Sequence, residues 1–226
     1  AHLCAIARDF LRGYAPRMAI YHLSAGFVSR SSGRSAVQSA AYITGERLME
    51  SRRDLVADYT HLKDRVLFST TLFPDKVPDK LKNLNIWDKL ESYEDRYGDT
   101  RYKTQASQDH YKGSSQTAQT IELALPKELT PESWQALVLD FAKERFVSRG
   151  LVVTVAIHKD EGNPHAHFQI SRRALNKQGD WSWAKDRGIV SKTALIETRA
   201  LWAELANQAL EREGFSVRID HRSYLV

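Results

Sequence analysis

Three histidines, His158, His165 and His167, lie within ten residues of one another near the middle of the chain. Residues 159–164 are rich in turn formers and separate the first histidine from the other two. On both sides of this stretch bulky residues alternate with smaller or polar ones, which predicts a β-hairpin with one face toward a core and the other open. Because strand side chains alternate between faces, His165 and His167 share the open face about 6–7 Å apart. His158 can approach them from the partner strand.

Imidazoles that converge in this way suit a metal ion. Neutral histidine is a common ligand of divalent cations, and three such ligands leave coordination positions open for a substrate. The alternative is a pair of surface histidines on an edge hairpin. We interpret the group as a metal site, because a third histidine stands at the neck of the hairpin and apolar faces lie behind all three.

A glutamate on another predicted strand, 117–125, faces away from the core as the histidines do. Glu122 alternates with Ile121 and Leu123, and the strand ends at Pro126. Its carboxylate could orient a ligating imidazole by accepting the second N–H of that ring. It could also take the proton of a nucleophile. The alternative is a solvated surface glutamate.

Four motifs along the chain, taken together, resemble a known family. They are residues 18–24 with 29–35 and 40–42, residues 121–130, residues 158–173 and residues 219–223. Their residue types and their order resemble the MobA/MobL (MobQ-class) group of conjugative relaxases, whose three-histidine signature is called HUH. The resemblance implies an amino-terminal domain that nicks single-stranded DNA at a plasmid transfer origin.

The resemblance also implies that Tyr42, where the first motif ends, is the nucleophile. The local pattern alone would make Tyr42 a core or rim residue of a helix, and Tyr21 is a rival that we expect to pack on its strand. A phenol ordinarily has a pKa of about 10, so it needs a base or a cation to react at neutral pH. We expect Tyr42 to attack one phosphodiester, leaving a 5′-phosphotyrosyl link and a free 3′-hydroxyl, and the strand to be rejoined later.

Cofactor and partners are expected on the same grounds. Imidazole ligands alone favour zinc, nickel or copper, whereas the resemblance implies one divalent metal ion, Mn²⁺ or Mg²⁺. It further implies accessory relaxosome proteins, a coupling protein that feeds a type IV secretion system, and a cytoplasmic bacterial protein that is transferred to the recipient cell with the DNA. Two alternatives remain: a rolling-circle replication initiator or transposase of the HUH class, and a non-catalytic single-stranded DNA-binding module.

Basic and aromatic side chains near the motifs are candidates for contact with DNA. The predicted phosphate contacts are Arg30, Arg34, Arg47, Arg172 and Arg173, and the predicted base-stacking residues are Trp181 and Trp183. Each arginine could instead be a solvated charge, and the two tryptophans could clasp the helix that follows them. His22 could contact a ligand of the metal site without binding the metal itself, contact DNA or be structural.

Strands mixed with helices predict an α+β fold with an antiparallel central sheet backed by helices, and the resemblance narrows this to an HUH relaxase-like two-layer α/β sandwich. The expected strands are 19–24, 117–125, the histidine hairpin 151–172 and 215–219, and the expected helices are 36–49, 130–148 and 191–213. Ser35 and Thr130 are the expected amino-terminal caps of the first two helices. Residues 50–116 show little periodicity beyond a short helical pattern at 82–97, and we expect an irregular insertion there.

Composition agrees with one basic domain. The chain has 226 residues and a net charge of +5, which favours an anionic partner. Its single cysteine, Cys4, excludes an intrachain disulfide, and no stretch approaches the roughly 20 apolar residues of a membrane span. We expect residues 1–17 to be an extension of unknown role and residues 18–226 to form the relaxase domain. We also expect the full-length protein to continue beyond residue 226.

Overall fold

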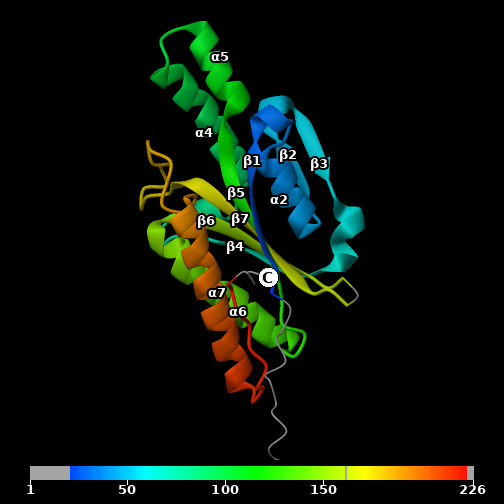
Figure 1. Ribbon diagram of the computed structural model, residues 1–226. Coiled ribbons are helices and arrows are strands. Elements are labelled where there is room, and N and C mark those ends of the chain that lie inside the picture. Colours follow the sequence, from blue (N-terminus) through cyan, green and yellow to red (C-terminus); the bar gives the residue numbers. More distant parts are fainter. Residues whose placement is uncertain (1–20, 161, 223–226) are drawn as a thin grey trace, which may run out of the picture.

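The computed structural model describes residues 21–160 and 162–222. At its centre lies a five-stranded sheet in the order β1-β5-β7-β6-β4, with antiparallel pairing throughout (Figure 1). The strands are β1 (Leu23–Ser29), β5 (Gln116–Ala124), β7 (His165–Ala174), β6 (Leu151–His158) and β4 (Val66–Leu72). The antiparallel central sheet expected from the sequence is therefore confirmed.

Helices α6 (Pro131–Arg145) and α7 (Lys192–Arg212) cover one face of this sheet. Between them and the strands lies the larger core, in which the ring of Phe141 meets Phe168 of β7 at 5.4 Å and Trp202 of α7 at 5.2 Å, both edge to face. Such aromatic contacts add to the free energy gained by burying the rings. The expected cap Thr130 accepts a hydrogen bond from the backbone N–H of the helix that it begins.

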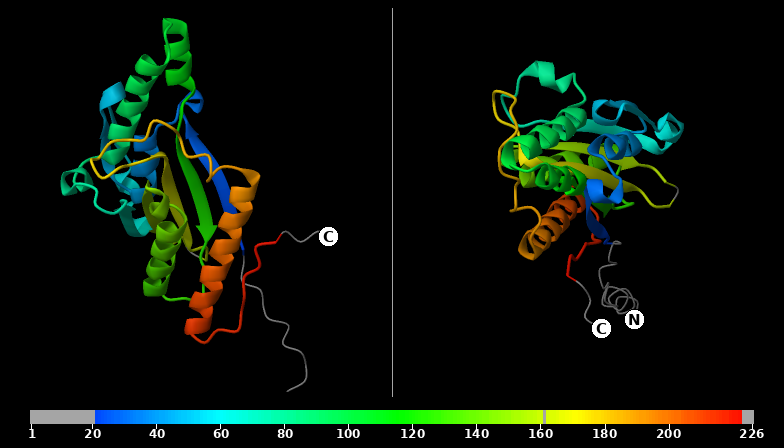
Figure 2. Two further views of the ribbon diagram at one scale, coloured as in Figure 1. Left: turned by 90° about the vertical axis from the view of Figure 1, so that its left-hand side faces the viewer. Right: turned by 90° about the horizontal axis from the view of Figure 1, so that it is seen from above.

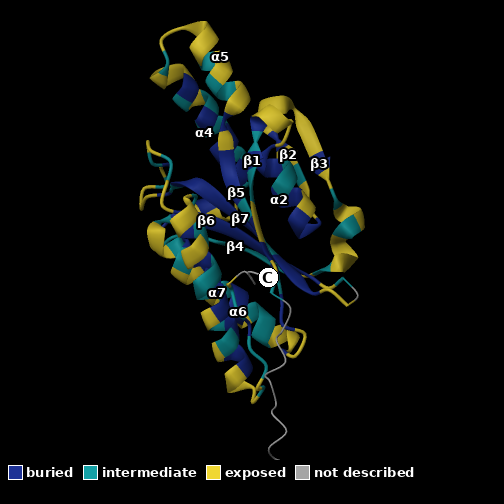
Figure 3. Ribbon diagram, viewed as in Figure 1, coloured by how far each residue is buried: buried dark blue, intermediate teal, exposed yellow. Residues whose placement is uncertain are grey.

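The opposite face of the sheet is covered as well, by α2 (Ala36–Thr44) and α4 (Ile86–Arg101), as the views in Figure 2 show for α2. Small residues such as Ala40 let α2 approach the sheet closely. As a result β6 is buried along its whole length (Figure 3), and the sheet has helices on both faces rather than one open face. The helix expected at 36–49 ends at Thr44, because Gly45 adopts a left-handed backbone conformation with φ of 63°.

Residues 50–116 are not the irregular insertion that the sequence suggested. The segment contains β4, the long helix α4 and a second helix, α5 (Gln105–Ser114), and α4 and α5 extend beyond the end of the sheet (Figure 1). The short helical pattern expected at 82–97 corresponds to α4, which runs from Ile86 to Arg101. The pattern was weak because the buried positions of α4 include Glu91 and Glu94, whereas hydrophobic periodicity detects only apolar stripes.

Shorter elements complete the chain: β2 (Arg47–Glu50), β3 (Leu55–Asp58) and α3 (Asp79–Lys82), together with the 3₁₀ turns η1 (Arg30–Ser32), η2 (Ser51–Arg53), η3 (Thr60–Arg65) and η4 (Val147–Arg149). The strand expected at 215–219 does not form. Instead Asn207 of α7 bonds both backbone groups of Ile219, so a side chain takes the place of a neighbouring strand. Within the described residues the first strand runs from Leu23 to Ser29, and residues 19 and 20 of the strand expected at 19–24 lie outside them.

The extension expected at 1–17 lies outside the described residues. Among the helices that the structure describes, none has the length and apolar character needed to cross a membrane.

Candidate metal centre and nucleophile

Strand register brings the three histidines together. His158 of β6 stands directly opposite His165 of β7, and His167, two residues further along β7, stands opposite Glu122 of β5. One ring nitrogen from each histidine lies within 4.8 Å of the other two, and the ring centroids are 4.5–5.3 Å apart. This is the convergence that the hairpin pattern predicts.

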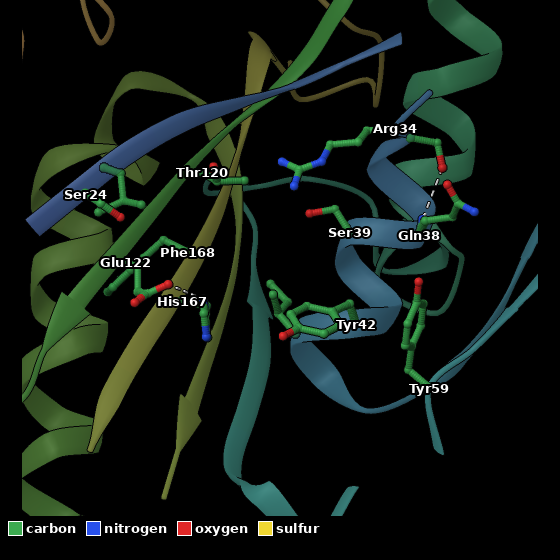
Figure 4. Close-up of a pocket in the computed structure, with 13 residues that line it drawn as sticks. Ser24, Arg34, Gln38, Ser39, Tyr42, Tyr59, Thr120, Glu122, His167 and Phe168 are labelled. Carbon is green, nitrogen blue, oxygen red and sulfur yellow. Dashed lines mark hydrogen bonds and ion pairs between the residues drawn. The ribbon is translucent and has the colours of Figure 1, made fainter. Parts of the chain in front are cut away.

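Each imidazole of this cluster has its own partner, which determines the nitrogen that remains available. Nε2 of His158 donates to the backbone carbonyl of Ile43 at 2.8 Å, and Nδ1 of His165 donates to the carbonyl of Asn163 at 2.8 Å. Nδ1 of His167 lies 3.8 Å from a carboxylate oxygen of Glu122 (Figure 4). A neutral imidazole carries only one N–H, so Nδ1 of His158 and Nε2 of the other two rings keep free lone pairs.

Burial keeps two of these rings in the form that binds metal. Burial lowers the pKa of His158. Burial, followed by the neighbouring histidines, lowers the pKa of His167 to about 3. Both rings are therefore neutral near pH 7, and a neutral ring is the form that ligates a cation. Three oriented nitrogens, two of them on rings held neutral by burial, fit a divalent ion.

A cavity of about 410 Å³ lies between α2 and strands β1, β5 and β7 (Figure 4). Tyr42, Glu122 and His167 all line it, and the hydroxyl of Tyr42 is directed toward His167. Tyr42 is 42% exposed, so a large substrate can reach it, and its ring meets Tyr59 edge to face at 5.5 Å. The structure therefore gathers the predicted nucleophile, the acidic residue and a histidine of the cluster around one cavity.

One functional candidate, Arg65, has no signal in the sequence motifs. Arg65 ends η3 and donates two hydrogen bonds, 2.9 and 2.6 Å long, to Asp160 in the loop of the histidine hairpin. The hydrogen bond to Asp160 raises the pKa of Arg65, and the nearby Tyr42 hydroxyl raises it further. Arg65 therefore connects the predicted nucleophile to the loop beside the histidines. It lies in the segment expected to be irregular, far from every motif.

Three of the predicted DNA contacts face solvent or the cavity. Arg34 lines the cavity beside Tyr42. The side chain of Arg47 on β2 is 67% exposed, and its ion pair with Asp58 is long at 3.9 Å. Trp183 is 52% exposed. These three remain candidates for contact with DNA.

The other four predicted contacts are buried, namely Arg30, Arg172, Arg173 and Trp181. Arg30 binds Glu91, and Arg173 binds Glu94, both on α4. The guanidinium of Arg172 lies over the ring of Phe27, and Trp181 packs in the core beneath α4. The prediction was wrong for these four residues, which are buried. Arg30 and Arg173 serve as counter-charges to buried glutamates on α4, whereas Arg172 and Trp181 pack against aromatic and apolar side chains.

His22 lies on the surface, next to β1. Its backbone carbonyl accepts the N–H of Ala124, but its imidazole makes no hydrogen bond or ion pair with another described residue. The expected support of the histidine cluster by His22 is therefore not seen.

Comparison with known proteins agrees with this geometry. The sequence model of the MobA/MobL family matches residues 34–226. Mobilization protein MobL of Acidithiobacillus ferridurans is 33% identical over 92% of this chain and 58% of its own length, so the chain spans little more than half of that relative. A solved structure concerned with vancomycin resistance transfer in Staphylococcus aureus is 30% identical, with a TM-score of 0.77 over 91% of this chain and 100% of that one.

A more distant solved structure shares the fold alone. The conjugative relaxase TrwC, in complex with oriT DNA, is 11% identical and has a TM-score of 0.51 over 85% of this chain and 70% of its own. The antiparallel sheet of this chain and its helices thus form the HUH relaxase-like fold expected from the sequence. On the match over residues 34–226 together with this shared architecture, the chain belongs to the MobA/MobL family.

Proposed function

We propose that this chain is the nicking domain of a conjugative relaxase, which cuts one strand at a plasmid transfer origin and later rejoins it. The observation that carries the proposal is the shared cavity, in which the exposed phenol of Tyr42 is directed toward His167 of the three-imidazole cluster. The mobilization and conjugal transfer proteins among the relatives support the same assignment.

His158, His165 and His167 would hold one divalent ion through the nitrogens left free by Ile43, Asn163 and Glu122. When bound, such an ion supplies positive charge that polarises a non-bridging phosphate oxygen and offsets charge in the transition state. We propose Mn²⁺ or Mg²⁺, because phosphate and water would provide oxygen ligands beside the imidazoles.

The side chains of the cavity carry the rest of the reaction. The phenolic oxygen of Tyr42 attacks phosphorus in line, the new O–P bond replaces the bond from phosphorus to the 3′-oxygen, and the leaving oxygen becomes a 3′-hydroxyl on protonation. Glu122, in the same cavity, is the proposed acceptor of the phenolic proton. Arg65 places a positive charge next to the reacting hydroxyl. One phosphodiester is exchanged for another, so the same groups can rejoin the strand.

The substrate of this proposal is single-stranded DNA of a transfer origin, with Arg34 and Arg47 on its phosphates. Relaxosome proteins, a coupling protein and a type IV secretion system are the proposed partners, and the cytoplasm is the proposed location. We also propose that residues 18–226 form one such domain of a longer protein.

The test is to incubate the protein with single-stranded DNA from the transfer origin of its own plasmid, with and without Mn²⁺, and to resolve the products on a denaturing gel. We expect a metal-dependent protein–DNA adduct and a second fragment that a polymerase can extend from its 3′-hydroxyl. DNA that is bound across several candidate origins but never cut would instead indicate a non-catalytic binding module.

The nucleophile is tested by Tyr42→Phe, with Tyr59→Phe as the matched control, because Tyr59 lines the same cavity and contacts the ring of Tyr42. We expect Tyr42→Phe to bind DNA as the wild type does and to form no adduct, while Tyr59→Phe still forms it. An adduct that persists in Tyr42→Phe and disappears in Tyr59→Phe would identify Tyr59 as the nucleophile.

A further inference from the structure

A second and larger cavity, of about 900 Å³, lies along α4 and shares no lining residue with the Tyr42 cavity. Its walls are one side of α4, the η2 turn and the loop 179–183 that follows β7. We call it the α4 groove. None of the four sequence motifs accounts for it, and the reaction proposed for Tyr42 does not use it.

The groove contains an aromatic side chain that is exposed and yet firmly supported. Trp183 is 52% exposed, and its ring lies 4.4 Å from that of Tyr97 on α4. The guanidinium of Arg173 lies 4.2 Å from the centre of the Tyr97 ring, and Arg173 is itself held by the buried carboxylate of Glu94. Arg173 also donates to the backbone carbonyl of Trp183. A ring supported in this way loses little conformational entropy when a ligand stacks on it.

The rim of the groove carries two cationic side chains that form no ion pair with the described residues. Lys89 and Arg96 line the groove, and neither forms an ion pair with another described residue. Two of the acidic residues in the lining are already engaged: Asp88 accepts hydrogen bonds from the backbone and the hydroxyl of Ser51, and Asp95 binds Arg30. Bonds from the neutral Ser51 leave the charge of Asp88 in place, so Asp88 and Asp180 put two carboxylates in the lining beside these two unpaired cations.

We propose that the α4 groove binds an unpaired nucleotide of single-stranded DNA outside the segment held at Tyr42. The base stacks on Trp183, and Lys89 and Arg96 contact the flanking phosphates. A flat aromatic surface beside mobile cations matches the two parts of a nucleotide, and stacking of this kind does not depend on the identity of the base. The choice of DNA as ligand rests on the proposed nicking function.

The experiment measures binding of fluorescently labelled oligothymidylate by anisotropy for the wild type, Trp183→Ala and Trp183→Phe. Ile196→Ala is the matched control, because Ile196 is an equally exposed large apolar residue on α7, outside the groove. We expect Trp183→Ala to raise Kd by about 5- to 100-fold, the range for loss of one stacked base. Trp183→Phe should recover most of the affinity, and Ile196→Ala should bind as the wild type does.

Two further measurements locate the bound nucleotide. With 5-iodouracil placed along the oligonucleotide, ultraviolet light should cross-link the strand to the peptide that contains Trp183. Replacing both Lys89 and Arg96 by Ala should reduce the slope of log Kd against log salt by about 0.7 for each phosphate that the protein no longer binds. The same Trp183→Ala variant should bind a duplex closed by a loop at each end as the wild type does, since base pairs inside a duplex have both faces covered and cannot stack on an external ring.

The outcomes separate this proposal from the nicking function. Three results would each contradict the proposal that the groove binds a nucleotide. They are a wild-type affinity of Trp183→Ala for single strands, an equal loss of its affinity for duplex, and cross-links only at other sites. The nicking function is measured separately, as adduct formation by the wild type and by Ile196→Ala, whose side chain lies outside both cavities. If Trp183→Ala weakens binding of single strands but no protein forms an adduct, nucleotide binding in the groove is supported and the proposed nicking function is contradicted.

Discussion

At the scale of single residues, each ring of the histidine cluster is held by a different part of the chain. Ile43 belongs to α2, Asn163 to the hairpin loop and Glu122 to β5. The rings are therefore oriented before any ligand binds, which reduces the cost of assembling a metal site. The bond to Ile43 also ties the cluster to α2, the helix that carries Tyr42.

Replacing Glu122 by Gln tests the support of His167. The amide cannot attract the imidazole N–H as a carboxylate does, so we expect affinity for Mn²⁺ to fall by about 10- to 100-fold, as measured by isothermal titration calorimetry. Glu128→Gln, an exposed change after the same strand, should leave it unaltered. Equal affinity in both variants would mean that Glu122 does not orient the ligand.

Replacing Arg65 by Gln tests its action on Tyr42. Loss of the charge beside the phenol should slow adduct formation by saturated DNA complexes by about tenfold or more, with little change in Kd. Arg65→Lys should recover part of the rate. Arg149→Gln is the matched control, since Arg149 also binds one carboxylate, that of Asp186, through several hydrogen bonds outside the Tyr42 cavity. If Arg65→Gln leaves the rate unchanged, Arg65 only forms a surface ion pair with Asp160 and does not act on Tyr42.

At the scale of elements, the helix that carries Tyr42 begins at a residue with two tasks. Ser35 caps α2 by accepting the N–H of Gln38, and its hydroxyl donates to the carboxylate of Glu50, which is fully buried. Burial opposes the charge of Glu50, but hydrogen bonds from Arg53 and Ser35 hold its pKa below the ordinary value. The start of α2 is thus joined to the end of β2 by a buried charge.

Comparing Ser35→Ala with Thr104→Ala separates the two tasks. Thr104 caps α5 in the same way, but it has no buried carboxylate to serve. We expect Thr104→Ala to lower the free energy of unfolding by about 1 kcal/mol. Ser35→Ala should lower it by about 2–4 kcal/mol, since a buried acceptor also loses its donor. Urea unfolding measures both, and equal losses would show that the bond to Glu50 contributes nothing.

At the scale of the whole molecule, a buried group of charges fastens α4 and α5 to the sheet. Glu94 of α4 binds Arg173 of β7 and Tyr111 of α5, and Lys185 lies 3.4 Å away. Burial alone would raise the pKa of Glu94, but the bond from Arg173 and the charge of Lys185 outweigh it and keep that pKa below its ordinary value. Burial is the main cause that lowers the pKa of Lys185 to about 8.

Glu94→Gln should therefore destabilise the domain by about 3–5 kcal/mol near pH 7, because it leaves Arg173 buried without its partner charge. The pKa of Glu94 is lower in the folded chain, so its contribution is complete above the unfolded value of about 4.3 and is lost as the pH falls through the folded value. Urea unfolding at several pH values should show the two proteins converging in acid. Glu204→Gln, an exposed change on α7, should follow the wild type at every pH, and a constant gap between wild type and Glu94→Gln would contradict the assignment.

What the sequence by itself determined is local. The alternation around His158, His165 and His167 placed them on one face, because a strand repeats every two residues whatever it packs against. Capping residues such as Thr130 marked where a helix begins, because their hydrogen bonds reach only three residues along the chain. The family motifs added Tyr42, whose role no local pattern indicates.

What only the tertiary structure decided is which charges meet. Arg30 and Arg173 resemble Arg34 in the sequence, yet the first two are buried against glutamates of α4, 61 and 79 residues away, while Arg34 lines the cavity. Arg65 reaches Asp160 across 95 residues. Such pairs depend on how distant elements pack, and an arginine carries the same charge whether it meets DNA or a buried carboxylate. Its surroundings, which only the folded chain supplies, determine its function.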